Sequence, residues 1–111
     1  MWDNRLRIFL MEEAKNFIDS LPHPVARKIY YNMRRIVDGE RNSDLFKKLT
    51  SSGIWEFRTL YAETAYRLFA FWDNKKGRLI VVTHGVVKKT QKASGRAIEK
   101  AEAIMRAYFK K

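Results

Sequence analysis

The sequence predicts a single α+β domain over residues 1–111, in the order strand, helix, helix, three strands, helix. Three observations lead to this prediction. Apolar residues recur at helical spacing between Glu12 and Gly39, at a spacing of two between Ile54 and Val87, and at helical spacing again after Ser94. With 46% hydrophobic residues in 111, the chain is long and apolar enough for one core. Consecutive strands joined by short turns favour a mainly antiparallel sheet with a compact topology.

The N-terminal part predicts a strand followed by a helical hairpin. The strand is expected over Arg5–Phe9, and the acidic residue Glu12 suits the first turn of the helix that follows. Pro22 ends that helix, Pro24 fits the first turn of the next one, and Gly39 ends the second helix. The apolar residues expected to share one face of this hairpin are Ala14, Phe17, Ile18, Leu21, Val25, Ile29, Met33, Ile36 and Val37.

The segment between the hairpin and the strands is expected to be irregular. Residues 40–43 are polar and predict a loop, residues 45–49 predict an apolar anchor, and residues 51–53 (Ser-Ser-Gly) predict a turn.

The C-terminal half predicts a three-stranded meander and a closing helix. The strands are expected at 54–61, 65–72 and 78–87, with turns at 62–64 and 73–77. Ser94 suits the N-cap of the last helix. The apolar side of that helix carries Ile98, Ala101, Ile104, Met105 and Tyr108.

Alternation in the first two strands of the meander separates two faces. The apolar face, expected to pack on the hairpin, carries Trp55, Phe57, Tyr66, Leu68, Ala70 and Trp72. The opposite face mixes charged and apolar side chains: Ile54, Glu56, Arg58, Leu60, Ala65, Arg67, Phe69 and Phe71. An arginine beside an exposed ring such as Phe69 can hold a phosphate while a base stacks on the ring, as in single-stranded RNA binding. The charged residues can instead form a surface ion-pair network, and the last helix can cover Phe69 and Phe71.

Charge is the outlying property of the chain. There are 23 Lys and Arg against 12 Asp and Glu, a formal net charge of +11, which favours RNA or DNA as partner. Residues 84–111 hold eight Lys and Arg against two Glu, so +6 of the excess follows the last strand. A charged run is often only a solvated face, but this one begins where a buried strand ends. Lys88, Lys89, Lys92 and Arg96 are therefore candidate RNA contacts.

Composition excludes several classes of protein. Without cysteine there is no disulfide scaffold, thiolate zinc site or cysteine nucleophile, and two histidines are too few for an all-histidine metal site. We expect no metal and no cofactor, and neither a phosphate-binding glycine loop nor a nucleophile elbow occurs. The longest uncharged stretches fall far below the roughly 20 residues that span a bilayer. The N-terminus has no secretory pattern, so a cytoplasmic protein without membrane contact is expected.

Three runs of residues resemble a known family. They are Gly53–Arg58 (GIWEFR), Tyr66–Phe69 (YRLF) and His84–Lys92 (HGVVKKTQK). They are similar to the phage-derived Gp49-like branch of the RelE/HigB toxins of type II toxin–antitoxin systems, within the RelE/ParE superfamily. Length, element order and basic charge agree, so the resemblance covers essentially the whole chain. The His-Gly-x-x-Lys-Lys-Thr run at the end of a strand is its most specific part.

The resemblance implies a toxin whose antiparallel sheet faces mRNA in the ribosomal A site. It further implies that the toxin is a metal-independent endoribonuclease, an mRNA interferase that inhibits translation. A cognate helix-turn-helix antitoxin would neutralise it and would link it indirectly to operator DNA.

The resemblance also implies roles for particular residues. Arg67 matches the middle-strand arginine that binds the scissile phosphate, Arg58 matches a basic position on the preceding strand, and Lys88 falls in the basic group after the last strand. Glu56 stands where better-studied relatives often have lysine, and His84 has no fixed counterpart.

Metal-free RNA cleavage needs a base for the 2′-OH, positive charge on the phosphate oxygens and an acid for the leaving 5′-oxygen. Arg58 and Arg67 suit the charge stabilisation. Glu56 is a candidate base with His84 or Lys88 as acid, and a lysine with a lowered pKa is an alternative base. Two other functions remain open: a ParE-like toxin that poisons DNA gyrase without cutting RNA, and a basic RNA-binding module.

Overall fold

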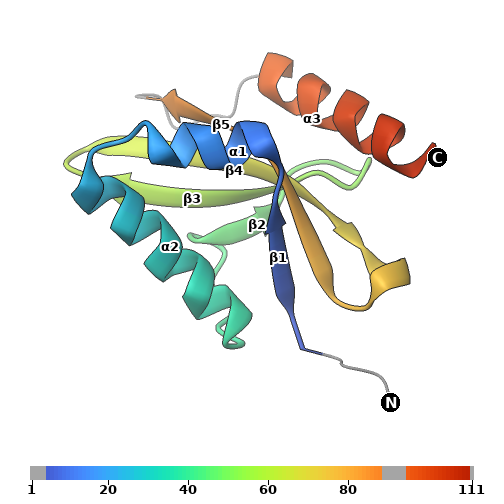
Figure 1. Cartoon of the computed structure of the whole chain (residues 1–111), viewed down its shortest axis with the longest axis horizontal. Helices are drawn as coiled ribbons and strands as arrows, with labels where there is room; N and C mark the ends of the chain where they lie inside the picture. The colour runs from blue at the N-terminus through green and yellow to red at the C-terminus, as the bar shows by residue number, and fades with distance from the viewer. Residues whose placement is uncertain (1–4, 89–94, 111) are drawn as a thin grey trace.

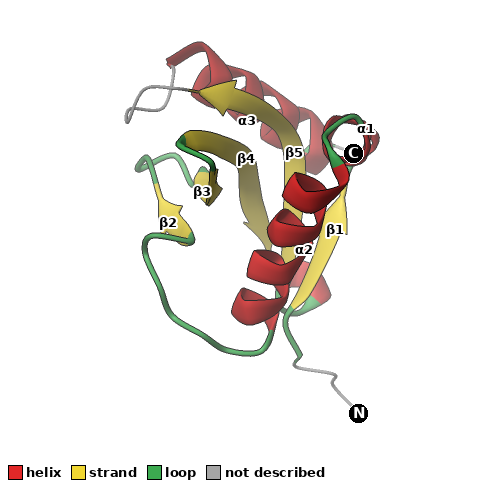
Figure 2. Cartoon of the chain, turned by 90° about the vertical axis from the view of Figure 1, so that its left-hand side faces the viewer, coloured by secondary structure: helices red, strands yellow, loops and turns green. Residues whose placement is uncertain are grey.

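The computed structural model describes residues 5–88 and 95–110, and it places one β-sheet between helices (Figure 1). The elements are β1 (Arg7–Leu10), α1 (Glu12–Asp19), α2 (His23–Val37), β2 (Phe46–Lys48), β3 (Trp55–Tyr61), β4 (Thr64–Asp73), the 3-10 turn η1 (Asn74–Lys76), β5 (Leu79–Lys88) and α3 (Gly95–Phe109). Figure 2 shows α2 on one side of the sheet and α3 on the other. The predicted α+β class, with a helical hairpin and a C-terminal helix, is confirmed. The Ser94 cap lies outside the described residues.

The sheet has five strands in the order β1-β5-β4-β3-β2. β1 runs parallel to β5, and the other neighbours are antiparallel, as predicted. The segment expected to be an irregular apolar anchor contains an additional strand: β2 pairs with β3 at the sheet edge, with Phe46 opposite Phe57. Three residues are too short to show a period of two, and their pairing partner is distant in sequence, so no local pattern predicts β2.

Each face of the sheet has its own apolar core. The core against α1 and α2 includes the strand residues Phe57, Leu68, Ala70, Ile80 and Val82. The core against α3 includes Ile54, Phe69, Phe71, Leu79 and Val81. The predicted separation of faces along β3 and β4 is confirmed, and α3 covers Phe69 and Phe71.

A β-bulge interrupts the pairing of β4 with β5. Ala70 lies opposite Val82, but Phe69 lies opposite His84, so Thr83 is an extra residue in β5. The bulge reverses the alternation: Val81 faces α3 and His84, three residues later, faces the same side. A strict period of two over 78–87 lacks this shift, so the predicted strand is corrected here.

Gly85 allows α1 to approach β5 closely. A Cβ atom built on Gly85 would lie 2.3 Å from Cδ2 of Phe17, far inside van der Waals contact. Only glycine fits at this position without moving the helix. This close contact seats α1 beside the end of β5 that carries His84.

Polar contacts attach α3 to the rest of the chain. The Tyr108 hydroxyl donates to Asp73 Oδ2 at 2.7 Å, and this hydrogen bond raises the pKa of Tyr108. Lys100 forms an ion pair with Glu13 of α1. In the described part of the chain, no helix is long and apolar enough to cross a membrane.

Candidate active site

The five predicted catalytic residues lie on one face of the sheet. Directly paired residues of neighbouring strands point to the same side, so the strand register places them. Three successive rows run across β3, β4 and β5: Glu56–Phe69–His84, Arg58–Arg67–Val86 and Leu60–Ala65–Lys88. The bulge is what brings His84 into this set, because without it the alternation would turn the imidazole toward α1 and α2.

Glu56 and Arg67 form a buried ion pair. Arg67 Nη1 lies 2.9 Å from Glu56 Oε2, and the two side chains are 1% and 0% exposed. Arg58 lies directly opposite Arg67 on β3, so two guanidinium groups share the neighbourhood of one carboxylate. Removing one partner of such a pair leaves a buried charge, which costs several kcal/mol. The pair therefore holds Arg67 in one position within a locally positive site.

The hydrogen bonds of His84 determine which of its ring nitrogens carries the proton. Thr83 Oγ1 donates its only proton to the carbonyl oxygen of Phe69 at 3.2 Å. The contact of 2.9 Å between Thr83 Oγ1 and His84 Nδ1 must then be donated by Nδ1–H. His84 Nε2 is left as a buried acceptor with no hydrogen-bond partner. The imidazole thus has the lone pair that a general base requires.

The surroundings keep His84 neutral. Its side chain is buried and stacks on Phe69 with ring centroids 5.2 Å apart. Burial lowers the pKa of His84 below 6.5, the Lys100 ammonium lowers it further, and Glu13 opposes both effects. Near neutral pH the imidazole accepts a proton rather than donating one. This geometry favours His84 as the base over the alternative in which it is the acid.

A small basic pocket opens beside His84. Its volume is about 360 Å³, and it lies among α1, β5 and α3. The lining residues are Glu13, His84, Gly85, Val86, Lys88, Arg96, Ala97 and Lys100. Its only carboxylate is already paired with Lys100, so the pocket is suited to an anion.

The predicted RNA-binding residues differ in their placement. Arg96 is exposed at the pocket with Lys88. Phe69 has no exposed surface and packs against Ala97 and Ala101, so the expected stacking of a base on its ring does not fit this structure. Lys89 and Lys92 lie outside the described residues.

Sequence reasoning missed Thr83 and Lys100, which both act on His84. Thr83 reaches the imidazole because of the bulge, and Lys100 reaches it because α3 docks beside β5. A hydroxyl residue directly before the histidine was the available signal for Thr83. Over residues 5–88 and 95–110, no three His, Asp or Glu side chains gather as a metal site.

Solved structures of RelE toxins share this fold at low sequence identity. An arginine-to-alanine double mutant of E. coli RelE in the free state has a TM-score of 0.65 at 13% identity, covering 91% of this chain and 97% of that one. The isolated E. coli RelE toxin has a TM-score of 0.57 at 16% identity, covering 89% and 98%. The RelE–RelB complex from Pyrococcus horikoshii OT3 gives 0.54 at 17% identity, covering 79% and 99%.

Sequence comparison assigns the family. No curated protein matches this chain. The family model described as phage-derived protein Gp49-like (DUF891) matches residues 16–106, which is most of the chain. The chain therefore belongs to the Gp49-like family and has the fold of RelE toxins.

Proposed function

We propose that this protein is the toxin of a type II toxin–antitoxin system and inhibits translation by cutting ribosome-bound mRNA. The observation that carries the proposal is the shared sheet face of Glu56, Arg58, Arg67, His84 and Lys88. The family and the RelE-like fold support the same function.

The proposed reaction is attack of a ribose 2′-oxygen on the adjacent phosphorus. The bond from phosphorus to the 5′-oxygen breaks, leaving a 2′,3′-cyclic phosphate and a 5′-hydroxyl. His84 Nε2 takes the proton of the 2′-OH, and Lys88 gives a proton to the departing 5′-oxygen. Arg58 and Arg67 stabilise the charge that develops on the phosphate oxygens, so the reaction is proposed to be metal-independent. Glu56 holds Arg67 in place rather than acting as the base.

RNA needs access that the described conformation does not offer. Glu56, Arg67 and His84 are each no more than 2% exposed, and α3 packs over Phe69 beside them. The ties of α3 are mainly side-chain contacts at the surface, such as the Lys100–Glu13 pair. We therefore propose that the active form is more open on the α3 side of the sheet.

The proposed partners follow from the same assignment. RelE is held by RelB in the complexes from E. coli and P. horikoshii. For this chain we propose a cognate helix-turn-helix antitoxin, the ribosome with its A-site mRNA, and operator DNA contacted only through the antitoxin. The site of action would then be the cytoplasm.

The decisive experiment maps 5′ ends of cellular mRNA after brief induction. Cuts within reading frames are expected for the wild-type chain and absent for Arg67→Ala, which should still bind the antitoxin. Because Arg67→Ala leaves Glu56 buried without its partner, the double variant Glu56→Gln/Arg67→Gln provides a neutral control that can still hydrogen-bond. Retained cutting by a folded Arg67 variant would refute the assignment. DNA breaks would indicate a gyrase-directed toxin, and neither kind of break would indicate RNA binding alone.

A further inference from the structure

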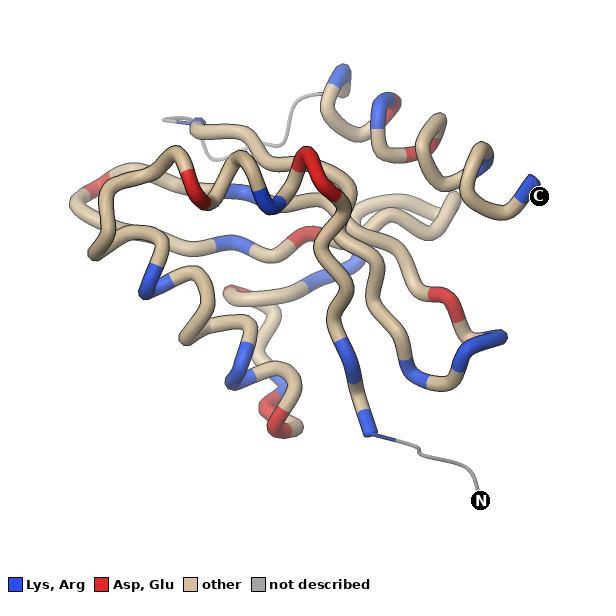
Figure 3. The backbone as a smooth tube through the Cα atoms, viewed as in Figure 1, with Lys and Arg blue, Asp and Glu red and all other residues tan. Residues whose placement is uncertain are grey.

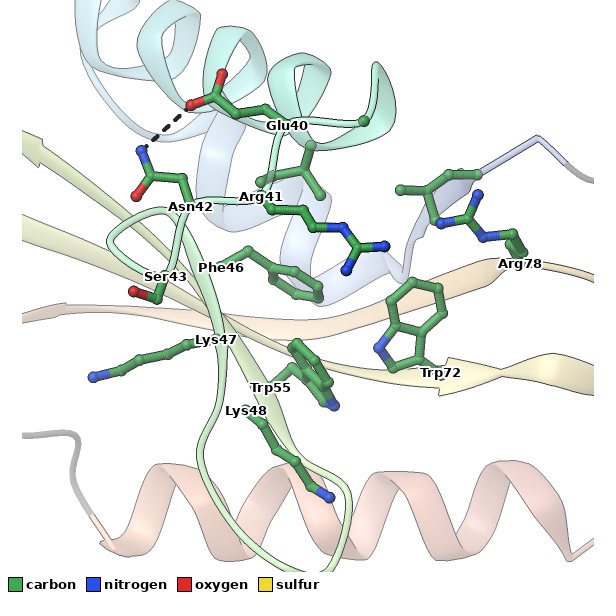
Figure 4. A pocket seen from close by; sticks show the side chains of 13 residues that line it. Glu40, Arg41, Asn42, Ser43, Phe46, Lys47, Lys48, Trp55, Trp72 and Arg78 are labelled. Atoms are coloured by element: carbon green, nitrogen blue, oxygen red, sulfur yellow. Dashed lines mark hydrogen bonds between the residues drawn. The ribbon is translucent and has the colours of Figure 1, made fainter.

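A groove on the other side of the sheet combines aromatic rings with cations. It has a volume of about 580 Å³ and lies between the loop after α2, strand β2 and the ends of β3 and β4 (Figure 4). The residues that line it are Leu6, Ile36, Gly39, Glu40, Arg41, Asn42, Ser43, Phe46, Lys47, Lys48, Trp55, Trp72 and Arg78. Phe46 and Trp72 pack on the core below α1 and α2, so the groove is on the face opposite His84 and Arg67.

Three rings form the floor of the groove. Phe46 stacks on Trp55 with centroids 4.8 Å apart, and Trp72 meets Trp55 edge-on at 6.0 Å. All three side chains are only half-buried, although aromatic rings of this size usually gain most when fully covered. Their remaining surface is available to a flat ligand.

The rim of the groove is positively charged. Arg41, Lys47, Lys48 and Arg78 are exposed, and in the described part of the chain none of them has a carboxylate within 4.0 Å. The Glu40 carboxylate beside them is bound by Arg35 at 2.7 Å. Figure 4 shows the Arg41 side chain extending into the groove on the side of Trp72 and Arg78. Figure 3 shows that basic residues occur on many elements, so what distinguishes this group is its position around the rings.

We propose that this groove binds a nucleotide unit, with its base stacked on the indoles of Trp55 and Trp72 and its phosphate held by Arg41 and Arg78. A nucleotide has both a π-face for the floor and a charge for the rim, which is how proteins hold single-stranded nucleic acid. An acidic peptide would satisfy the cations but lacks a flat group to match the floor, and an apolar ligand would leave the cations without counter-charge. The volume falls in the range of about 300–1,000 Å³ typical of small-ligand sites. The site goes beyond the proposed cleavage, because it lies on the opposite face and involves no reaction.

Tryptophan fluorescence of the full chain tests this proposal, since two of its three tryptophans lie in the groove. One arm titrates a single-stranded 2′-O-methyl oligoribonucleotide, which has no 2′-OH to attack, and the other titrates free AMP. Saturable quenching is expected with the oligonucleotide. Quenching by AMP as well would assign the site to free nucleotides in addition to strands. No ribosome is present, so the outcome is independent of mRNA cleavage.

Two double variants with the same change in net charge make the test specific. Arg41→Glu/Arg78→Glu should weaken oligonucleotide binding roughly tenfold or more and reduce the salt dependence by about one per lost phosphate contact. Arg27→Glu/Arg106→Glu changes exposed cations away from the groove and should bind as the wild type does. Equal weakening in both variants would overturn the proposal in favour of general electrostatic attraction. Unchanged emission with both nucleic acid probes, while purified cognate antitoxin changes it, would overturn it in favour of a protein-docking surface.

Discussion

Replacing Thr83 by valine tests whether His84 is held in the tautomer proposed for the base. Thr83 is fully buried, and valine has nearly the same shape, so no cavity forms. The change removes the acceptor 2.9 Å from His84 Nδ1 and the donor 3.2 Å from the Phe69 carbonyl oxygen. An unsatisfied buried group costs about 1–3 kcal/mol, and the longer bond to a carbonyl with a second lone pair contributes about 1. We therefore expect Thr83→Val to lower the free energy of unfolding by about 2–4 kcal/mol.

Two assays separate the structural and the chemical effect of this change. Urea denaturation measures the loss of stability, and ribosome-dependent mRNA cleavage measures the rate at a temperature where the variant stays folded. Without Thr83 the imidazole can place its proton on Nε2, so the cleavage rate should fall about tenfold or more, as expected for a base with the wrong tautomer. Thr83→Ser keeps the hydroxyl and should retain most of the rate.

A particular pair of results would refute the reasoning. If Thr83→Val unfolds at the same urea concentration as the wild type and cleaves mRNA at the same rate, Thr83 does not orient His84. If only stability falls, the hydrogen bond is structural and His84 is not the base.

Three further predictions follow from contacts around the site. Gly85→Ala should destabilise the chain by about 1–3 kcal/mol, because its Cβ meets Phe17 at 2.3 Å; urea denaturation would show it, and an unchanged midpoint would mean that α1 shifts freely. Because burial lowers the pKa of folded His84, the unfolded chain takes up a proton near pH 6.5 before the folded chain does, so stability should fall as pH drops below 6.5. Thermal unfolding from pH 7.5 to 5 should show this slope in the wild type and a weaker one in His84→Asn; equal slopes would contradict it. Tyr108→Phe removes the hydrogen bond to Asp73 and should cost about 1–2 kcal/mol by urea denaturation while raising the mRNA cleavage rate, if α3 must open; a lower rate would exclude opening as the limiting step.

Local patterns account for the predictions that agree with the structure. A helix repeats every 3.6 residues and a strand every two, so the hairpin, β3, β4 and α3 are visible in the order of apolar residues. The same alternation separated Phe57 and Leu68 from Glu56 and Arg67, and it placed the two arginines on one face before any coordinates were considered.

The features that agree less well depend on contacts between distant residues. β2 exists because Phe46 pairs with Phe57, and the burial of Phe69 depends on where α3 docks. The bulge at Thr83 reverses the face of His84, because one inserted residue shifts every following side chain to the other side of a strand.

Element types, the two sheet faces and the basic character therefore follow from the order of residues alone, since each depends on near neighbours or on composition. The neutral His84, the closed Arg67–Glu56 pair and the aromatic groove of Trp55 and Trp72 follow only from packing. Each of these brings together side chains from separate elements, and the energies that fix them, burial, hydrogen bonding and ring contact, arise between residues far apart in the chain.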